Sequence, residues 1–183
     1  ASALLDTLLS HTPAIDRKTL IIPLGGGVAG DMAGFVAAVA LRGLKFLQVP
    51  TSLLADVDSS VGGKTGVDHA AGKNLIGAFH QPGGVIIDVE TLRTLPLAEL
   101  RNGLGECVKH GVIRQPALLD FIEANATNLL AEEDCIGCKK LAFDANVMIE
   151  LIRRNVAIKA AVVSADEREA GVRGHLNYGH TIG

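Results

Sequence analysis

Along the first half of the chain, the apolar residues gather in short runs that glycine or proline bounds. The runs at residues 19–24, 46–49 and 85–89 have the length of buried β-strands. Residues 4–9 carry apolar side chains at helical spacing, and the Ala-rich segment 31–42 predicts a helix that is apolar nearly all round. Because a helix or a long connection lies between successive strands, we expect a parallel sheet.

Polar and glycine-rich residues mark the connections between these segments. Gly43 is typical of the residue that follows a helix, and Thr51 or Ser52 can cap a short helix that continues to Asp58. Residues 62–74 are polar and rich in glycine, so the pattern predicts a loop there.

The pattern changes near Pro96. Beyond it the strand signals stop, and three successive helices are predicted over residues 97–113, 116–131 and 138–165. We therefore expect two domains, an α/β domain over residues 1–95 and an all-helical domain over residues 96–183.

Two features indicate a piece of a longer chain. Three strands are few for a parallel sheet, which needs cover on both faces. The sequence also stops at Gly183, just after a segment typical of the start of a helix. We therefore expect both domains to be partial.

Composition and charge argue against several classes of function. A formal net charge of -3 argues against nucleic-acid binding as the main function, and no apolar run is long and charge-free enough to span a bilayer. The first residues lack the features of a signal peptide, and three cysteines fit a reducing compartment, so we expect a cytoplasmic protein. We interpret Cys135 and Cys138 as thiols associated with helices rather than as a zinc-binding or redox pair.

The first segment with chemical character is residues 25–31 (GGGVAGD). It follows a predicted strand, precedes a predicted helix and satisfies the pattern G-x-G-x-x-G, which is typical of dinucleotide binding. Bare backbone at these glycines lets a pyrophosphate lie against the N–H groups of the helix end. A tight turn without a ligand is the alternative. Since no acidic residue ends the next strand to bind a ribose, the arrangement is not an ordinary Rossmann one.

The second segment is residues 57–66 (VDSSVGGKTG), together with residues 72–74 (GKN). Its Gly-Gly-Lys-Thr part is similar to a P-loop, but the first glycine of that motif is not at the required spacing. Backbone N–H groups and the ammonium groups of Lys64 and Lys73 favour binding of a phosphate or a carboxylate. A solvated loop is the alternative.

Two further groups of residues can bind a metal or an anion. Glu106, Lys109 and His110 share one side of a predicted helix, where Glu106 can be a metal ligand or a general base. A surface ion pair of Glu106 with Lys109 is the alternative, and His110 by itself is expected on the helix surface or facing a partner. Arg173 can bind a carboxylate or phosphate through two parallel hydrogen bonds. His180 has the backbone room of a metal ligand, although a histidine that merely ends a loop is the alternative.

Together these segments closely resemble the 3-dehydroquinate synthase family. The similarity is almost continuous over residues 25–82 and extends to residues 94–96 (TLP), 105–109 (GECVK) and 176–181 (LNYGHT). It implies a Rossmann-like α/β NAD-binding part followed by an all-α metal-binding domain. It also implies conversion of 3-deoxy-arabino-heptulosonate 7-phosphate to 3-dehydroquinate and phosphate, in the shikimate pathway, with NAD and Zn²⁺ or Co²⁺ as cofactors.

The resemblance implies roles for individual residues. Glu106 and His180 are implied as two of three metal ligands. Contacts to the phosphorylated sugar acid are implied for Asp58, Lys64, Asn74, Lys109, Lys159, Arg173 and Asn177. Contacts to NAD are implied for Gly26, Gly27, Val28, Ala29, Gly30, Asp31, Thr51, Ser52, Lys64, Lys73, Thr91, Leu92, Arg93 and Thr94. Arg42 is implied to reach the substrate phosphate, across the interface of a homodimer.

The resemblance leaves departures and alternatives. The family extends beyond both ends of this sequence, and its third metal-binding histidine follows Gly183, so we expect the chain to be inactive alone. A sister sugar phosphate cyclase that acts on another sugar phosphate is one alternative, although Arg173 and Asn177 favour the dehydroquinate enzyme, because arginine suits a substrate carboxylate. A metal-dependent polyol or alcohol dehydrogenase would lack the segment 57–65. A non-catalytic scaffold would not need Lys64, Lys73, Glu106, Lys109 and His180 together.

Overall fold

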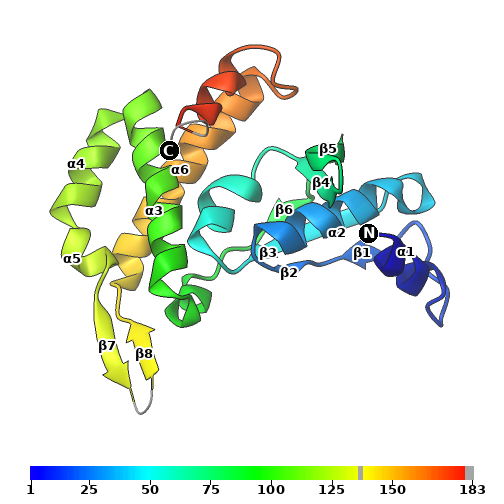
Figure 1. Cartoon of the computed structure of the whole chain (residues 1–183), viewed down its shortest axis with the longest axis horizontal. Helices are drawn as coiled ribbons and strands as arrows, with labels where there is room; N and C mark the ends of the chain where they lie inside the picture. The colour runs from blue at the N-terminus through cyan, green and yellow to red at the C-terminus, as the bar shows by residue number, and fades with distance from the viewer. Residues whose placement is uncertain (136–137, 180–183) are drawn as a thin grey trace. The chain divides into compact units, whose positions relative to one another are not determined.

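The chain folds into two compact units, labelled by their elements in Figure 1. The computed structural model describes residues 1–135 and 138–179, without the side chains of Asn74 and of residues 132–140. The first unit consists of Ala1–Pro50 and Gly63–Ile87, and the second of Thr51–Gly62 and Asp88–Gly183. The division is therefore discontinuous along the sequence, because a short segment of the first half belongs with the later helices.

A parallel sheet forms the centre of the first unit. Its strand β3 (Lys45–Pro50) pairs in parallel with β1 (Leu20–Ile21), β2 (Leu24–Gly25) and β6 (Gly84–Val85). The parallel sheet predicted from the sequence is confirmed. The first predicted strand is divided in two around Pro23, since proline cannot donate a hydrogen bond to a neighbouring strand.

The core of this unit is a small apolar cluster beside the sheet. Ala37, Ala40, Leu44 and Phe46 are fully or almost fully buried in it, and apolar residues of α1 (Ser2–Leu9) pack against them. Helix α2 (Gly27–Val39) begins at the glycine-rich turn and ends in the short helix η1 (Ala40–Arg42). The predicted helix over residues 31–42 is therefore present, but it starts four residues earlier.

Residues 62–74 are not the loop that their polar, glycine-rich sequence predicts. Antiparallel strands β4 (Lys64–His69) and β5 (Gly72–Phe79) form a hairpin there, in which Gly66 lies opposite Gly77. A Cβ at Gly66 would lie 2.8 Å from the carbonyl oxygen of Ile76. The glycines therefore allow two backbones to approach closely, which the sequence pattern does not distinguish from a loop.

Helices make up most of the second unit. Its helical elements are η2 (Ala55–Ser59), η3 (Val89–Thr94), α3 (Leu97–Arg114), α4 (Pro116–Ala124), α5 (Ala126–Leu129), α6 (Ala145–Ala165) and η4 (Val172–Asn177). Two short strands, β7 (Glu132–Cys135) and β8 (Cys138–Leu141), form a hairpin between α5 and α6. An α/β part followed by a mainly helical part is thus confirmed, with this hairpin as an addition.

The hairpin corrects two predictions. The third predicted helix begins at Ala145 and not at Cys138, because the Asp144 carboxylate caps it by accepting hydrogen bonds from the N–H groups of Asn146 and Val147, at 2.8 and 3.1 Å. Cys135 and Cys138 lie opposite each other in the two strands, so their assignment to helices is wrong.

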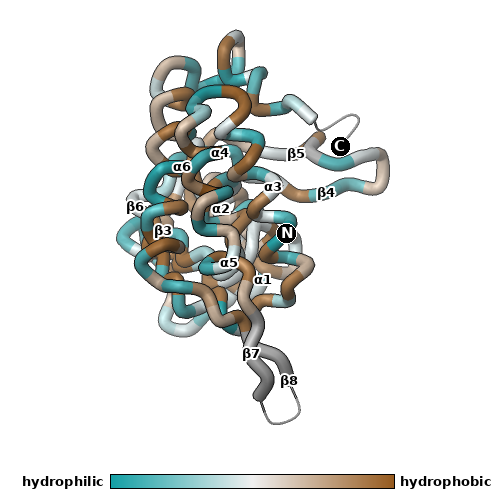
Figure 2. Tube along the Cα trace, turned by 90° about the vertical axis from the view of Figure 1, so that its left-hand side faces the viewer, coloured by the Kyte–Doolittle hydropathy of each residue, from teal (hydrophilic) through white to brown (hydrophobic). Residues whose placement is uncertain are grey.

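Helix α6 is the long central element of the second unit. Hydrophobic and hydrophilic stretches alternate along its trace (Figure 2), and its buried residues recur at helical spacing. Two of those buried residues, Asn155 and Lys159, are polar. Within the described part of the chain, no helix combines the length and apolar character needed to cross a membrane.

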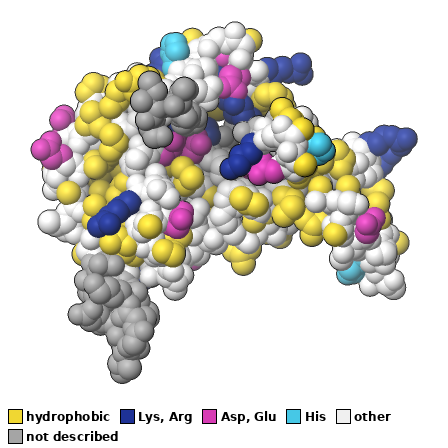
Figure 3. All heavy atoms as spheres, viewed as in Figure 1, with side chains coloured by type: hydrophobic (Ala, Val, Ile, Leu, Met, Phe, Trp, Pro, Cys, Tyr) yellow, Lys and Arg dark blue, Asp and Glu magenta, His cyan; other side chains and the backbone are white. Residues whose placement is uncertain are grey.

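Apolar side chains also reach the surface, and they cover much of the face shown in Figure 3. Val28 and Leu24 are among the most exposed of them. This agrees with a composition that is 48% hydrophobic.

Candidate active site

Helix α3 carries three polar side chains that meet on its buried side. Glu106 Oε1 lies 2.5 Å from Lys109 Nζ and 3.3 Å from His110 Nε2. The Glu106 residue is 8% exposed and His110 is fully buried. The pair of Glu106 and Lys109 is therefore not a surface ion pair, and the expectation that His110 lies on the surface or faces a partner is wrong.

Close helix packing explains this burial. A Cβ at Gly103 would lie 2.6 Å from Leu53 Cβ, and one at Gly111 would lie 2.6 Å from a side-chain atom of Leu119. Bare backbone at the two glycines lets α3 approach the segment that precedes η2 and helix α4. One side of α3 between the glycines is enclosed as a result, and Glu106 and His110 lie on that side.

The buried Lys159 forms a second ion pair with the partly exposed Asp58, although they are 101 positions apart. Lys159 Nζ lies 2.5 Å from Asp58 Oδ1 and also donates to the Asp58 backbone carbonyl. Burial lowers the pKa of Lys159, whereas the Asp58 carboxylate opposes that shift. Asp58 lies within η2, so the pair joins η2 to α6.

The carboxylates and the imidazole can hold a divalent metal. Ligand atoms of Asp58, Glu106 and His110 all lie within 4.8 Å of one another. Burial by itself raises the pKa of Glu106, but the His110 ring and the Lys109 ammonium outweigh burial and lower this pKa to about 2. Glu106 is therefore an ionised carboxylate near neutral pH, and carboxylate oxygen with imidazole nitrogen is a ligand set that Zn²⁺ accepts. His180, the other predicted ligand, lies outside the described residues.

Arg173 and Lys109 add positive charge to the same unit. Arg173 is 2% exposed, and its guanidinium donates to the carbonyl oxygens of Gly62 and Glu167, at 3.0 and 2.5 Å. Lys109 Nζ also donates to the carbonyl oxygen of Leu176 at 2.6 Å. Backbone contacts therefore orient both cations, and Lys109 is in addition paired with the Glu106 carboxylate.

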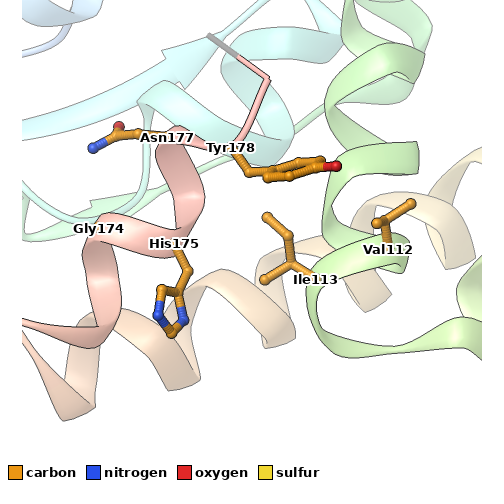
Figure 4. A pocket seen from close by; sticks show the side chains of 6 residues that line it. All are labelled: Val112, Ile113, Gly174, His175, Asn177 and Tyr178. Atoms are coloured by element: carbon orange, nitrogen blue, oxygen red, sulfur yellow. The ribbon is translucent and has the colours of Figure 1, made fainter. Parts of the chain in front are cut away.

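Asn177 lies on η4, at the edge of a pocket of about 590 Å³ (Figure 4). Its side chain points away from the Tyr178 ring, which lies beside Ile113. The Asn177 amide donates to Glu169 Oε1 at 2.8 Å and is exposed. The side chain of Asn177, which is predicted to contact substrate, is therefore held by Glu169 in the segment before η4.

The glycine-rich turn and the two lysines of the second segment belong to the first unit. Gly26 precedes α2, and its carbonyl accepts the N–H groups of Ala29 and Gly30. A Cβ at Gly30 would lie 2.6 Å from Gln48 Oε1, so the turn packs closely on β3. Lys64 and Lys73 are exposed on the β4–β5 hairpin.

The other predicted cofactor and phosphate contacts are divided between the units. Arg42 is an exposed residue of the first unit, at the end of η1, with a positive φ of 65°. Thr51 and Ser52 belong to the second unit, where Ser52 Oγ accepts from the N–H of Ala55 at 3.4 Å. Thr91–Thr94 lies in η3, where Arg93 pairs with Glu90 at 2.7 Å.

Comparison with known sequences decides the family. The family model for the 3-dehydroquinate synthase N-terminal region matches residues 1–102, and the model for the C-terminal region matches residues 103–183. The chain belongs to the 3-dehydroquinate synthase family. A 3-dehydroquinate synthase of Citrifermentans bemidjiense is 55% identical over 170 residues, which are 93% of this chain and 44% of that relative. One of Nitrosospira multiformis is 51% identical over 178 residues, 97% of this chain and 45% of the relative. The chain thus spans less than half the length of these curated relatives.

Solved structures show the same fold. A 2-epi-5-epi-valiolone synthase from Streptomyces hygroscopicus, with NAD⁺ and Zn²⁺ bound, is 25% identical with a TM-score of 0.84, over 98% of this chain and 48% of the other. A 2-deoxy-scyllo-inosose synthase in complex with carbaglucose-6-phosphate, NAD⁺ and Co²⁺ is 27% identical with a TM-score of 0.85, over 98% of this chain and 46% of the other. A glycerol dehydrogenase of Schizosaccharomyces pombe, 18% identical with a TM-score of 0.62 over 87% of this chain and 44% of that chain, shares the fold alone.

Two buried polar residues of this family member were not singled out from the sequence. Asn155 Oδ1 lies 3.0 Å from His110 Nδ1, and Asn155 is fully buried on α6. Asp56 is also fully buried, neither of its carboxylate oxygens has a hydrogen-bond partner among the described residues, and burial raises its pKa to about 8. The sequence does contain a signal for Asn155. This residue precedes Lys159 by one helical turn, and the other buried positions of α6 are apolar.

Proposed function

We propose that the protein containing this chain is a 3-dehydroquinate synthase that uses NAD and a divalent metal. It would convert 3-deoxy-arabino-heptulosonate 7-phosphate to 3-dehydroquinate and phosphate. The observation that carries the proposal is the buried Glu106 carboxylate, which is ionised and lies among cationic side chains in a family member more than 50% identical to curated 3-dehydroquinate synthases.

The metal would bind at Glu106 and His180, with Asp58 and His110 as neighbouring donors. When bound, a Zn²⁺ or Co²⁺ ion polarises the reacting oxygen and lowers the pKa of the carbinol. Glu106 brings the negative charge that the cation needs. Its low pKa means that no proton has to leave before a metal binds near neutral pH.

The anionic substrate would bind near the buried cations. Lys109, Lys159 and Arg173 are held by buried contacts, so they offer charge in fixed positions and lose little side-chain entropy when an anion binds. Arg173 can bind a carboxylate with two parallel hydrogen bonds, which favours a sugar acid over a neutral sugar. Asp58, Lys64, Asn74 and Asn177 complete the proposed substrate contacts, and Arg42 is proposed to reach the phosphate across a homodimer interface.

NAD would bind through the glycine-rich turn, with its pyrophosphate against the N–H groups that begin α2. The residues proposed to contact NAD are the segment Gly26 to Asp31, Thr51, Ser52, Lys64, Lys73 and the segment Thr91–Thr94. Because the glycines leave the helix end bare, a diphosphate can approach the backbone directly.

A sister sugar phosphate cyclase is the second candidate. Two cyclases with other names are similar in structure, with TM-scores of 0.84 and 0.85. Their identity to this chain is 25% and 27%, against 55% for the 3-dehydroquinate synthase of Citrifermentans bemidjiense. The higher identity favours the dehydroquinate reaction.

The test is release of phosphate from 3-deoxy-arabino-heptulosonate 7-phosphate by the full-length protein, with NAD and Zn²⁺, before and after a chelator. We expect release that the chelator abolishes and Zn²⁺ or Co²⁺ restores, with dehydroquinate as product. Release from another sugar phosphate instead would move the protein to a sister cyclase. No release from any sugar phosphate would overturn the proposal.

A further inference from the structure

One carboxylate ties together the loop that joins α6 to η4. Asp166 follows the last residue of α6, and its Oδ1 accepts the N–H of Ala170 at 2.8 Å. Its Oδ2 accepts the N–H groups of Gly171 and Arg173, at 2.7 and 3.0 Å. Three N–H groups of a short segment therefore converge on a single side chain.

These contacts also keep the carboxylate ionised. The N–H of Arg173 is the largest cause that lowers the pKa of Asp166, and the N–H groups of Ala170 and Gly171 lower it further against the opposing effect of burial. A hydrogen bond to an ionised acceptor is stronger than one to a neutral acceptor. The loop is therefore closed by charge-assisted contacts near neutral pH.

The closed loop contains a backbone conformation that residues other than glycine rarely adopt. Glu169 has a φ of 59°, in the left-handed region that is unfavourable for a residue with a Cβ. Such a conformation persists only where the surrounding contacts fix it. Asp166 supplies these contacts, because it binds the N–H groups of Ala170 and Gly171, the two residues that follow Glu169.

The same loop holds both ends of η4. At its start, Arg173 is held through its N–H by Asp166 and through its guanidinium by the carbonyl oxygen of Glu167. Toward its end, the amide of Asn177, labelled in Figure 4, donates to Glu169 Oε1 at 2.8 Å. Both proposed substrate contacts of η4 therefore depend on a loop whose shape Asp166 maintains.

The guanidinium of Arg173 has the features of a recognition group that is fixed in advance. It donates to the carbonyl oxygen of Gly62 at 3.0 Å, and a Cβ at Gly62 would overlap the same Nη2 atom. The bare backbone of Gly62 thus makes room for it. A guanidinium has five N–H groups, and its two described contacts use one each, so further N–H groups can bind a carboxylate.

We propose that Asp166 is a positioning residue, which closes the loop before η4 and so fixes the guanidinium of Arg173 for the carboxylate of the substrate. The inference rests on the proposed function for the identity of the substrate, and it goes beyond it by assigning Asp166, which touches neither substrate nor metal in this scheme. An arginine that is ordered in advance loses less side-chain entropy on binding, so Asp166 should favour a sugar acid over a neutral sugar.

The experiment compares the binding of two ligands to the full-length protein with NAD and Zn²⁺, by calorimetric titration. Both are analogues of the heptulosonate phosphate in which a methylene phosphonate, which cannot leave, replaces the phosphate ester. One analogue keeps the carboxylate, and the other carries a hydroxymethyl group in its place. Asp166→Ala should weaken binding of the carboxylate analogue about 10-fold more than binding of the hydroxymethyl analogue, the cost of ordering a mobile arginine on binding.

Asp144→Ala is the matched control. The Asp144 carboxylate caps the other end of the same helix by accepting two backbone N–H groups, so its loss should also lower the midpoint of urea unfolding. It should nevertheless keep the wild-type ratio of the two affinities. A change of this ratio in Asp144→Ala as large as in Asp166→Ala would overturn the proposal, as would equal ratios in the wild type and in Asp166→Ala.

Two further variants separate positioning from a general loss of structure. Asp166→Asn keeps one acceptor oxygen for the N–H groups of Gly171 and Arg173, so its affinity ratio should lie between those of the wild type and Asp166→Ala. If Asp166 acts through Arg173, the double variant Asp166→Ala/Arg173→Met should have the same ratio as Arg173→Met alone. A further change of the ratio in the double variant would overturn the proposal.

The outcomes also distinguish this proposal from the proposed function. A protein that prefers the carboxylate analogue in an Asp166-dependent way, but releases no phosphate from the heptulosonate phosphate, leaves the positioning role standing and overturns the reaction. A wild-type protein that releases phosphate but binds both analogues equally overturns the positioning role alone. A wild-type protein that binds neither analogue and releases no phosphate overturns both.

Discussion

The two units of the chain hold their predicted functional groups in opposite ways. In the first, the glycine-rich turn relies on bare backbone, and Lys64 and Lys73 are exposed on a hairpin. In the second, Glu106, His110 and Lys159 are buried and bound to one another or to backbone. Backbone sites depend on a short stretch of sequence, whereas the buried cluster depends on contacts between distant residues. The glycine-rich turn should therefore tolerate side-chain changes around it, whereas the buried cluster should not.

Glu106→Gln is expected to have the largest effect. It removes the charge of the proposed metal ligand and leaves the Lys109 ammonium buried without its carboxylate. We expect phosphate release to fall by about 10³-fold, which corresponds to about 4 kcal/mol. Glu99→Gln, at an exposed position of the same helix, should keep wild-type activity. Comparable rates for the two variants would contradict a special role for the buried carboxylate.

Asp56→Asn should change how stability depends on pH. Burial raises the pKa of Asp56 to about 8, so the folded state retains a proton that the unfolded state releases near the ordinary aspartate pKa of 3.8. The stability that this proton contributes is complete below pH 4 and is lost as pH rises toward 8, to the extent of a few kcal/mol. Urea unfolding of the full-length protein at several pH values measures this loss. As pH rises, the free energy of unfolding should fall less in Asp56→Asn than in the wild type. The exposed control Asp120→Asn should follow the wild type, and an equal slope in all three proteins would refute this account.

Lys159→Met should destabilise the second unit by about 2 kcal/mol, because it leaves Asp58 with no counter-charge in a partly buried position. Urea unfolding is the measurement. Arg153→Met removes an exposed cation of the same helix and should cost less than about 0.5 kcal/mol. If both variants lose the same stability, the pair between α6 and Asp58 is not a structural contact.

Gly34→Ala tests close packing in the first unit. Its Cβ would lie 2.5 Å from Thr65 Cγ2 and 3.2 Å from the Phe46 ring, and both neighbours are buried. Overpacking of this kind costs about 1–3 kcal/mol. A thermal melt that is unchanged would mean that α2 does not lie as close to β4 as described.

Gly105→Ala also replaces a helical glycine with alanine, but we expect it to raise the stability of the protein instead of lowering it. Among the described residues, no atom outside the neighbouring backbone of the helix lies within 4 Å of a Cβ at Gly105, which is exposed on α3. Alanine restricts the unfolded chain more than glycine and favours the helix, so we expect a gain of about 0.5–1 kcal/mol. A loss in the thermal melt would show that this face of α3 is covered in the full-length protein.

The first unit was the easier of the two to predict from sequence. Strand β3 and helix α2 follow from short apolar runs and from the glycines before them, and both depend on neighbours in sequence. The β4–β5 hairpin was missed because its glycines serve close strand pairing, and a sequence pattern does not separate that from a turn. The β7–β8 hairpin was missed because it is short and lies between two helices.

The candidate site was predicted in part. Glu106, Lys109 and Arg173 were singled out, and the structure brings Glu106 and Lys109 together. The burial of His110 and its contact with Asn155 could not be predicted, because the two residues are 45 positions apart on different helices. Likewise, the pairing of Asp58 with Lys159 needs the segment Thr51–Gly62 to join the second unit, which no local pattern indicates.

The most direct test of the account is where the metal binds. An anomalous difference map, recorded at the zinc edge from crystals of the full-length protein grown with Zn²⁺, locates the ion without assumptions about the reaction. We predict a peak about 2.0–2.2 Å from a carboxylate oxygen of Glu106, the ordinary length of a Zn–O bond. A zinc peak away from Glu106, or a well-ordered Glu106 with no peak beside it, would contradict the central role of this carboxylate.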